Sequence, residues 1–106
     1  MTALPADARE ALEVLTRALG ERFGGRVGVY IFGSYARGEQ TPASDLDVLL
    51  VVPPELRQAV RQRAAEVVSG LQIGGAPPIG FVLIDPERWQ QPSPFIREVQ
   101  RDAVPL

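Results

Sequence analysis

The sequence predicts a small α/β protein of the α+β kind, with a mixed sheet of three to four strands and helices packed on it. Two observations predict this class: apolar residues alternate between helical spacing and short continuous runs, and Gly- and Pro-rich segments separate these stretches. The resulting order is helix, strand, strand, helix, strand, helix. With 106 residues, the chain has the length of one domain, which we place at residues 1–106.

Two long stretches, 5–25 and 54–72, have the apolar spacing of amphipathic helices. In the first, the apolar stripe is Leu12, Leu15, Leu19 and Phe23; in the second, it is Leu56, Val60, Ala64, Val67 and Leu71. A third helix is expected over 93–104, where Ser93 is a suitable N-cap and Pro94 suits the first helical position.

Strands are expected over 26–33, 45–52 and 79–84, where the residues are mostly apolar and Gly or Pro lies at or near the ends. The runs in the second and third strands predict burial on both faces. Between the first two strands, residues 34–44 are expected to form a turn or short helical piece and then a loop. Residues 85–91 are expected to form a short helical turn.

The composition excludes several kinds of chemistry. The chain has no Cys and no His, and all 11 of its basic residues are Arg, so thiolate, imidazole and lysine chemistry are excluded. The net charge of −2 disfavours general DNA binding, which usually requires a basic surface. No apolar run approaches the roughly 20 residues of a membrane span, so we expect a cytoplasmic protein without membrane contact.

Two carboxylates open the second expected strand. Asp45 and Asp47 are two residues apart, so their side chains should point to the same face. Two negative charges at such a short distance repel each other unless a cation lies between them. Carboxylate oxygens suit Mg²⁺ or Mn²⁺ as that cation. The alternative is that both aspartates are solvated at the mouth of the strand and bind nothing.

The residues that precede these aspartates suit a phosphate group. Gly33 ends the first expected strand and would let a phosphate approach the backbone, while Ser34 adds a hydroxyl donor. Arg37 lies one helical turn after Ser34, so it could form a charge-assisted pair with the phosphate. The alternative for Arg37 is an ion pair with a carboxylate of the same motif.

This pattern resembles the signature of the DNA polymerase beta–like nucleotidyltransferase superfamily. The matching residues are G-S-Y-A-R-G, an eight-residue step from Arg37 to Asp45, and S-D-L-D followed by apolar residues. The short chain and its order of elements resemble the minimal nucleotidyltransferase branch. The motif covers about 15 residues, and the element order extends the resemblance over nearly the whole chain.

The resemblance implies that Gly33 and Ser34 bind a triphosphate, with Arg37 in support, and that Asp45 and Asp47 hold Mg²⁺ or Mn²⁺ and serve in catalysis. It implies a nucleotide substrate, usually ATP, from which AMP is transferred. Members of this branch typically pair with a helical HEPN-domain protein as antitoxin and toxin, so a hetero-oligomer or a homo-oligomer is expected.

The sequence departs from the family pattern at a third carboxylate, which normally lies near the start of a later strand. Here that position falls on Gly80, which has no side chain. Asp85 is an odd number of residues further on and about 16 Å away along an ideal strand, so it suits a turn before Pro86 better. Glu39 is a weaker candidate. The chain is therefore either a nucleotidyltransferase or a weakly active or inactive module of the same fold that occludes a HEPN partner.

The C-terminal segment 91–106 and Trp89 have two interpretations. Trp and Arg are common at interaction surfaces, so the segment could bind a partner. Alternatively, Trp89, Phe95, Ile96 and Val99 cap the sheet.

Overall fold

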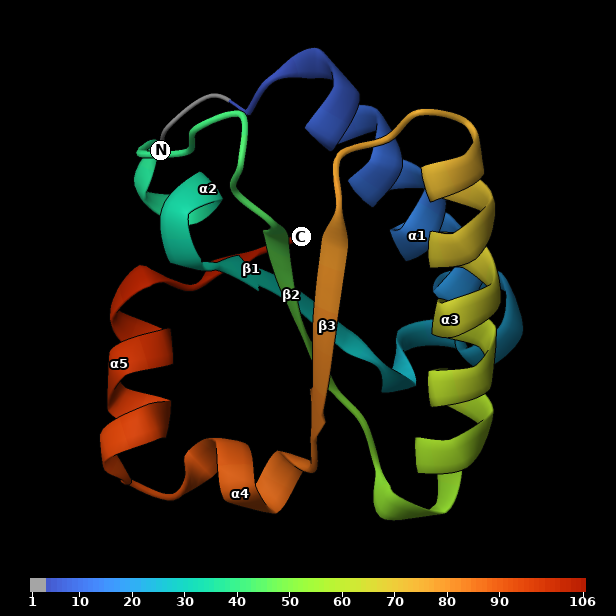
Figure 1. Cartoon of the computed structure of the whole chain (residues 1–106). Coiled ribbons are helices and arrows are strands. Elements are labelled where there is room, and N and C mark those ends of the chain that lie inside the picture. Colours follow the sequence, from blue (N-terminus) through green and yellow to red (C-terminus); the bar gives the residue numbers. More distant parts are fainter. Residues whose placement is uncertain (1–3) are drawn as a thin grey trace.

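The computed structural model describes residues 4–106, and Met1–Ala3 lie outside the described residues. It has a four-stranded mixed sheet with helices on both faces, which confirms the predicted fold class (Figure 1). The elements in chain order are α1 (Ala6–Phe23), β1 (Gly28–Phe32), α2 (Gly33–Arg37), β2 (Leu46–Val51), α3 (Arg57–Ile73), β3 (Ile79–Ile84), α4 (Pro86–Gln90), α5 (Pro94–Asp102) and β4 (Val104–Pro105).

The strands lie in the order β3-β2-β1-β4. Strand β1 is antiparallel to both β2 and β4, whereas β2 and β3 are parallel. A parallel pair needs a long crossover connection, and α3 supplies it between β2 and β3. Strand β2 is thus flanked by β1 on one side and β3 on the other, and both neighbours contribute to the surroundings of its first residues.

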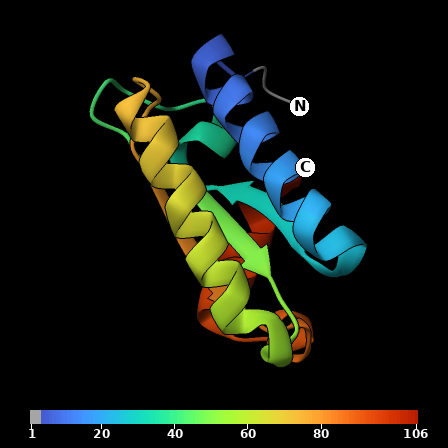
Figure 2. The same cartoon turned by 90° about the vertical axis from the view of Figure 1, so that its right-hand side faces the viewer.

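One face of the sheet is covered by α1 and α3, which lie side by side in front of the strands in Figure 2. The buried residues on this face alternate along the strands, as expected for side chains that point to one side. From β1 to β3 they are Val29, Ile31, Leu46, Val48, Leu50, Ile79 and Leu83. The first predicted helical stripe supplies Leu12, Leu15 and Leu19 to this core, and the second supplies Val60 and Ala64.

The opposite face is covered in part by α4 and α5. Trp89, Ile96 and Val99 are buried there against the sheet residues Leu49, Val51 and Ile84. The ring centroids of Tyr30 and Trp89 are 5.0 Å apart, with the rings tilted by 43°. The sheet-capping interpretation is therefore correct for Trp89, Ile96 and Val99, whereas Phe95 stays 45% exposed.

The predicted N-cap of the last helix is confirmed, because the Ser93 hydroxyl accepts a hydrogen bond from the Ile96 N–H at 3.2 Å. Asp85 is likewise the N-cap of α4, and its Oδ1 accepts a hydrogen bond from the Arg88 N–H at 2.7 Å. Burial of β3 on both faces is wrong. This strand lies at the sheet edge, and Gly80 and Val82 are exposed on the face of α4 and α5.

Strand β4 was not predicted from the sequence. It is only two residues long, too short for a detectable pattern, and it pairs with Tyr30 and Ile31 at the other edge. Within residues 4–106, no helix has the length and apolar character that crossing a membrane requires.

Candidate functional site

The turn from β1 into α2 brings the backbone of Gly33 against Asp47. Gly33 has a φ of +74°, a conformation that residues with a Cβ rarely adopt. A Cβ at this position would also collide with the Oδ2 atom of Asp47. The positive φ is the constraint that favours glycine here, whereas the Asp47 carboxylate could rotate away from a Cβ. The glycine leaves the start of α2 directly beside this carboxylate.

The two aspartates occupy different environments. Asp45 is exposed and lies one residue before β2 begins, so the predicted strand starts one residue early. Asp47 is half-buried in β2, directly opposite Phe32 of β1. Burial raises the pKa of Asp47, and so does the negative charge of Asp45, while the positive charge of Arg37 lowers it. The negative charges of Asp45 and Asp47 are therefore close enough to repel each other.

Gly80 lies beside Asp47 on the other neighbouring strand, because the parallel register pairs these two residues. A Cβ on residue 80 would lie 3.9 Å from the Asp47 Oδ1 atom, an ordinary van der Waals distance. A carboxylate at this position would therefore point into the same site as Asp47. Gly80 leaves that space without a side chain.

The donor set fits one hard divalent cation. Within residues 4–106, no three His, Cys, Asp or Glu side chains gather in a group able to hold a metal ion. Magnesium is commonly bound by only one or two protein carboxylates, with phosphate oxygens and water completing its shell. The desolvation of Asp47 and its repulsion by Asp45 both favour the arrival of a cation.

Arg37 ends α2 and makes two ion pairs. Its Nη1 donates a hydrogen bond to Asp102 Oδ2 at 3.0 Å, and its Nε donates one to Glu39 Oε2 at 3.2 Å. The hydrogen bonds with Asp102 and Glu39 raise the pKa of Arg37. This side chain therefore links α2 to α5 and carries a fixed positive charge beside Gly33.

The other candidate carboxylates do not complete the site. Asp85 lies beyond the far end of β3 from Gly80, where its side chain caps α4. Glu39 is exposed in the segment after α2 and pairs with Arg37. Ser34 is half-buried as the second residue of α2, and its carbonyl accepts a hydrogen bond from the Glu39 N–H at 2.9 Å.

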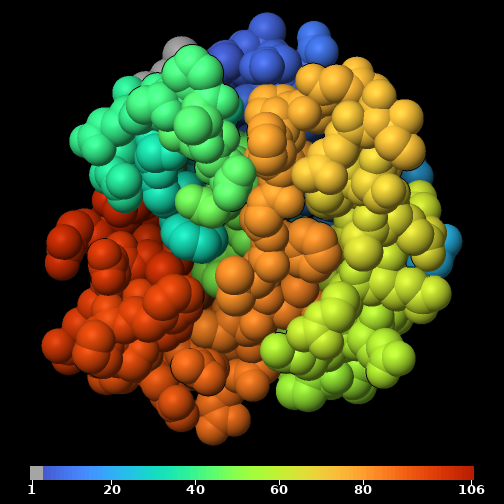
Figure 3. All heavy atoms as spheres, viewed as in Figure 1, coloured from blue at the N-terminus to red at the C-terminus, as the bar shows by residue number. Residues whose placement is uncertain are grey.

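A hollow of about 270 Å³ adjoins Gly33 on the side of α5, and sequence reasoning missed it. It is lined by Phe32, Gly33, Arg37, Phe95, Glu98, Val99 and Asp102. Figure 3 shows this side of the molecule, with teal and green atoms of the β1–α2 and β2 region at the surface between red α5 and orange β3. Its walls come from segments more than 50 residues apart in the chain, so no local pattern could indicate it.

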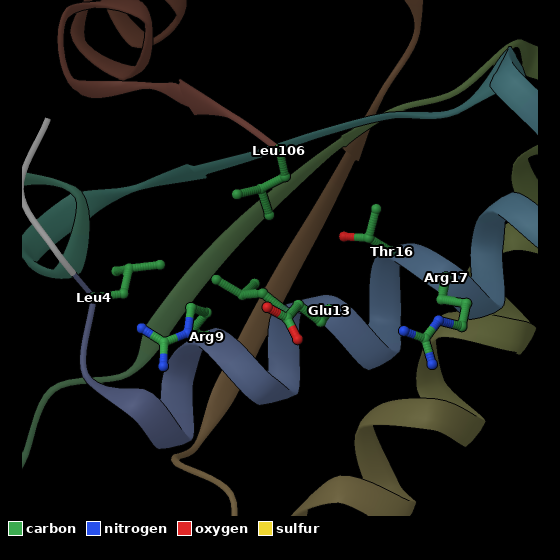
Figure 4. A pocket seen from close by; sticks show the side chains of 7 residues that line it. Leu4, Arg9, Glu13, Thr16, Arg17 and Leu106 are labelled. Atoms are coloured by element: carbon green, nitrogen blue, oxygen red, sulfur yellow. The ribbon is translucent and has the colours of Figure 1, made fainter.

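A larger hollow of about 430 Å³ lies elsewhere, along α1 (Figure 4). The surface that lines it is mostly apolar, because the polar residues contribute mainly their carbon atoms. The lining residues are Leu4, Arg9, Leu12, Glu13, Thr16, Arg17 and Leu106. The residues expected in the functional site all lie outside this lining. Its size therefore does not identify it as the place of chemistry.

The fold is that of the nucleotidyltransferases. The family model described as a nucleotidyltransferase domain matches residues 12–104, and the chain belongs to this family. This match confirms the resemblance of the sequence to the nucleotidyltransferases.

Two known proteins show the similarity in different ways. A Methanocaldococcus jannaschii protein named "putative protein adenylyltransferase" is 42% identical over 43 residues, which are 40% of this chain and 43% of that protein. The chain thus matches less than half the length of this relative. A crystal structure titled as a "putative nucleotidyltransferase" from Sulfolobus solfataricus superposes with a TM-score of 0.51 and 21% identity, over 99% of this chain and 90% of that one. This second similarity shows the shared fold.

Proposed function

We propose that this chain binds a nucleoside triphosphate with Mg²⁺ and transfers its nucleoside monophosphate to a protein acceptor. ATP is the expected substrate and AMP the transferred group. Gly33 and Ser34 contact the phosphates, Arg37 supports them, and Asp45 and Asp47 hold the Mg²⁺ or Mn²⁺ ion. The observation that carries the proposal is the junction of Gly33 with Asp47, which puts a glycine-lined turn and a carboxylate pair side by side.

The proposed reaction is a displacement at the α-phosphorus of the triphosphate. An acceptor hydroxyl oxygen forms the new bond to this phosphorus, the bond to the β-phosphate bridging oxygen breaks, and pyrophosphate leaves with that electron pair. The hydroxyl proton passes to solvent or to a base. When bound, the metal ion neutralises negative charge on the phosphates.

A protein acceptor is supported by two considerations. The relative from Methanocaldococcus jannaschii bears the name of a protein adenylyltransferase, and the minimal branch typically pairs with HEPN-domain proteins. We propose a HEPN-type partner as the acceptor, with this chain as the antitoxin of the pair.

A second function is favoured by Gly80. The residue beside Asp47 has no carboxylate, and a missing general base typically lowers the rate by about 10²–10⁴-fold. The alternative is a module that binds the nucleotide weakly or not at all and neutralises a HEPN partner by covering it. The presence of Asp45 and Asp47 favours nucleotidyl transfer, whereas Gly80 favours the module that only covers its partner.

The first test is a calorimetric titration of the chain with Mg²⁺-ATP. We expect saturable binding that requires Mg²⁺ and that the double variant Asp45→Asn/Asp47→Asn loses. The matched control is Glu87→Gln, an exposed acidic residue in α4 that lies outside the proposed site. If the wild type does not bind ATP at millimolar concentration, the proposed transferase activity is contradicted. The alternative function, in which the chain covers a HEPN partner, is then supported.

The second test restores the third carboxylate. Gly80 is exposed, and a Cβ there would make only an ordinary contact with Asp47, so Gly80→Asp should fold. In an assay that follows labelled ATP onto a HEPN partner, we expect Gly80→Asp to raise the transfer rate by about 10²-fold or more. Gly80→Asn is the control, since it has the same shape without the charge. Equal rates for the two variants would show that a carboxylate at this position does not limit transfer.

A further inference from the structure

We infer that the hollow between α2 and α5 is the subsite for the nucleoside part of the nucleotide, with its aromatic base stacked on Phe95. The inference rests on the proposed function, because it assumes that a triphosphate binds at Gly33 and Asp47. It goes further by assigning a binding role to α5, which the glycine, serine and aspartate motif does not include.

The hollow lies directly beside the proposed phosphate site. Gly33 and Arg37 belong to both, and Phe32, which forms part of the wall, lies opposite Asp47 in the sheet. A ligand whose phosphates are held at Gly33 and Asp47 therefore has two flanks available. One is the walled hollow toward α5, and the other is the exposed surface of Gly80 and Val82.

The size and the walls of the hollow suit an aromatic heterocycle. A volume of about 270 Å³ has room for a base but falls below the range of about 300–1,000 Å³ typical of pockets that enclose whole ligands. Phe95 is 45% exposed although its neighbour Ile96 is buried. An exposed ring on the wall of a hollow offers a stacking surface, and a base stacks on such a ring whatever its identity.

The charges around the hollow indicate which end of the nucleotide enters it. Two carboxylates line the hollow: Asp102 is paired with Arg37, and Glu98 adds a negative charge that repels phosphates. The same carboxylates can accept hydrogen bonds from ribose hydroxyls or from an exocyclic amino group of the base. Arg37 also lines the hollow, where it pairs with Asp102, and its positive charge acts on Asp47 as well. The uncharged end of the nucleotide is thus directed toward α5 and the charged end toward Asp47.

The experiment compares Mg²⁺-ATP with Mg²⁺-tripolyphosphate, which has the phosphates without the nucleoside. We expect the wild type to bind ATP at least tenfold more tightly. Phe95→Ala should weaken ATP binding by about tenfold, the usual size of a lost base–aromatic stack, and leave tripolyphosphate binding unchanged. Phe95→Tyr should restore ATP binding. Ile73→Ala, which removes an exposed apolar side chain at the end of α3, is the control.

The outcomes separate the inference from the proposed function. If neither ligand binds the wild type, the phosphate site itself is absent and both proposals fall. If both ligands bind equally well, or if Phe95→Ala leaves ATP binding intact, the phosphate site stands and the nucleoside subsite is overturned. Equal loss of both ligands in Phe95→Ala would also overturn it, because Phe95 would then act through the structure of α5.

Discussion

The two faces of the sheet are made by the same strands but are covered to different extents. The strand residues that face α1 and α3 are apolar, and this face is closed along β2 from Leu46 to Leu50. On the opposite face, α4 and α5 cover Leu49 and Val51, while Asp47 at the start of the same strand stays partly open. Strand β2 therefore contributes to the candidate site at Asp47 and to the core at Leu49, only two residues further on.

The residues that stabilise the fold and the residues of the candidate site thus form separate sets on this small sheet. The closed face can be packed without polar groups because nothing has to reach it from solvent. The open part of the other face carries two carboxylates, a glycine with a positive φ and an exposed Val82. Such features cost stability, and proteins retain them mainly where a ligand binds.

The largest effect on stability is expected on the closed face. Leu50 is fully buried between the sheet and its two helices. We expect Leu50→Ala to lower the free energy of unfolding by about 2–5 kcal/mol, measured by urea denaturation, because it removes apolar contacts and leaves a cavity. Val82→Ala on the open face is the control and should cost less than about 1 kcal/mol. Similar losses for both variants would refute the contrast between the faces.

A second, smaller effect is expected from the two glycines that flank Asp47. Gly33→Ala places a Cβ against Asp47 in a left-handed conformation, so it should destabilise the fold by about 1–3 kcal/mol. Gly80→Ala has an ordinary contact at 3.9 Å from Asp47 Oδ1 and no positive φ, so its melting temperature should stay the same or rise slightly. Thermal melts of both variants check this. Equal destabilisation would mean that the backbone of Gly33 is not specially constrained.

Local patterns were sufficient to predict most of the fold. The helical stripes, the strand runs, the cap at Ser93 and the turn at Asp85 depend on neighbouring residues, and each led to the correct element. The fold class followed from their order. The short β4 and the exposure of Val82 could not be predicted, because both depend on which strands lie at the sheet edges.

The candidate site was predictable in part for the same reason. Gly33, Asp45 and Asp47 lie within one short motif, so the sequence indicates that they act together. The partner of Arg37 was not predictable, since Asp102 is 65 residues away and is brought close by the packing of α5. The hollow beside Gly33 was not predictable either, because it too forms only when α5 packs beside α2. Roles for these residues stay predictions until the binding experiments are done.

A third prediction concerns a gain in stability from removing a charge on the open face. In the folded protein, burial and Asp45 raise the pKa of Asp47, so the ionised carboxylate destabilises the native state at neutral pH. Asp47→Asn should therefore raise the melting temperature by a few degrees when no divalent cation is added. Asp45→Asn, at an exposed position, should raise it less. A lower melting temperature for Asp47→Asn would show that this charge is compensated within the fold.

The smallest effect on stability is expected at the ion pair between Arg37 of α2 and Asp102 of α5. Arg37 and Asp102 are 3.0 Å apart, but their side chains are 42% and 20% exposed, so water and salt screen the attraction. We expect Asp102→Asn to shift the melting temperature by no more than a degree or two at low salt, and not at all at 1 M salt, where the Debye length falls to about 3 Å. Glu39→Gln, which removes the other and more exposed partner of Arg37, should shift it less. A large shift that persists at high salt would instead make the contact between α2 and α5 a structural requirement of the fold, comparable with the closed face.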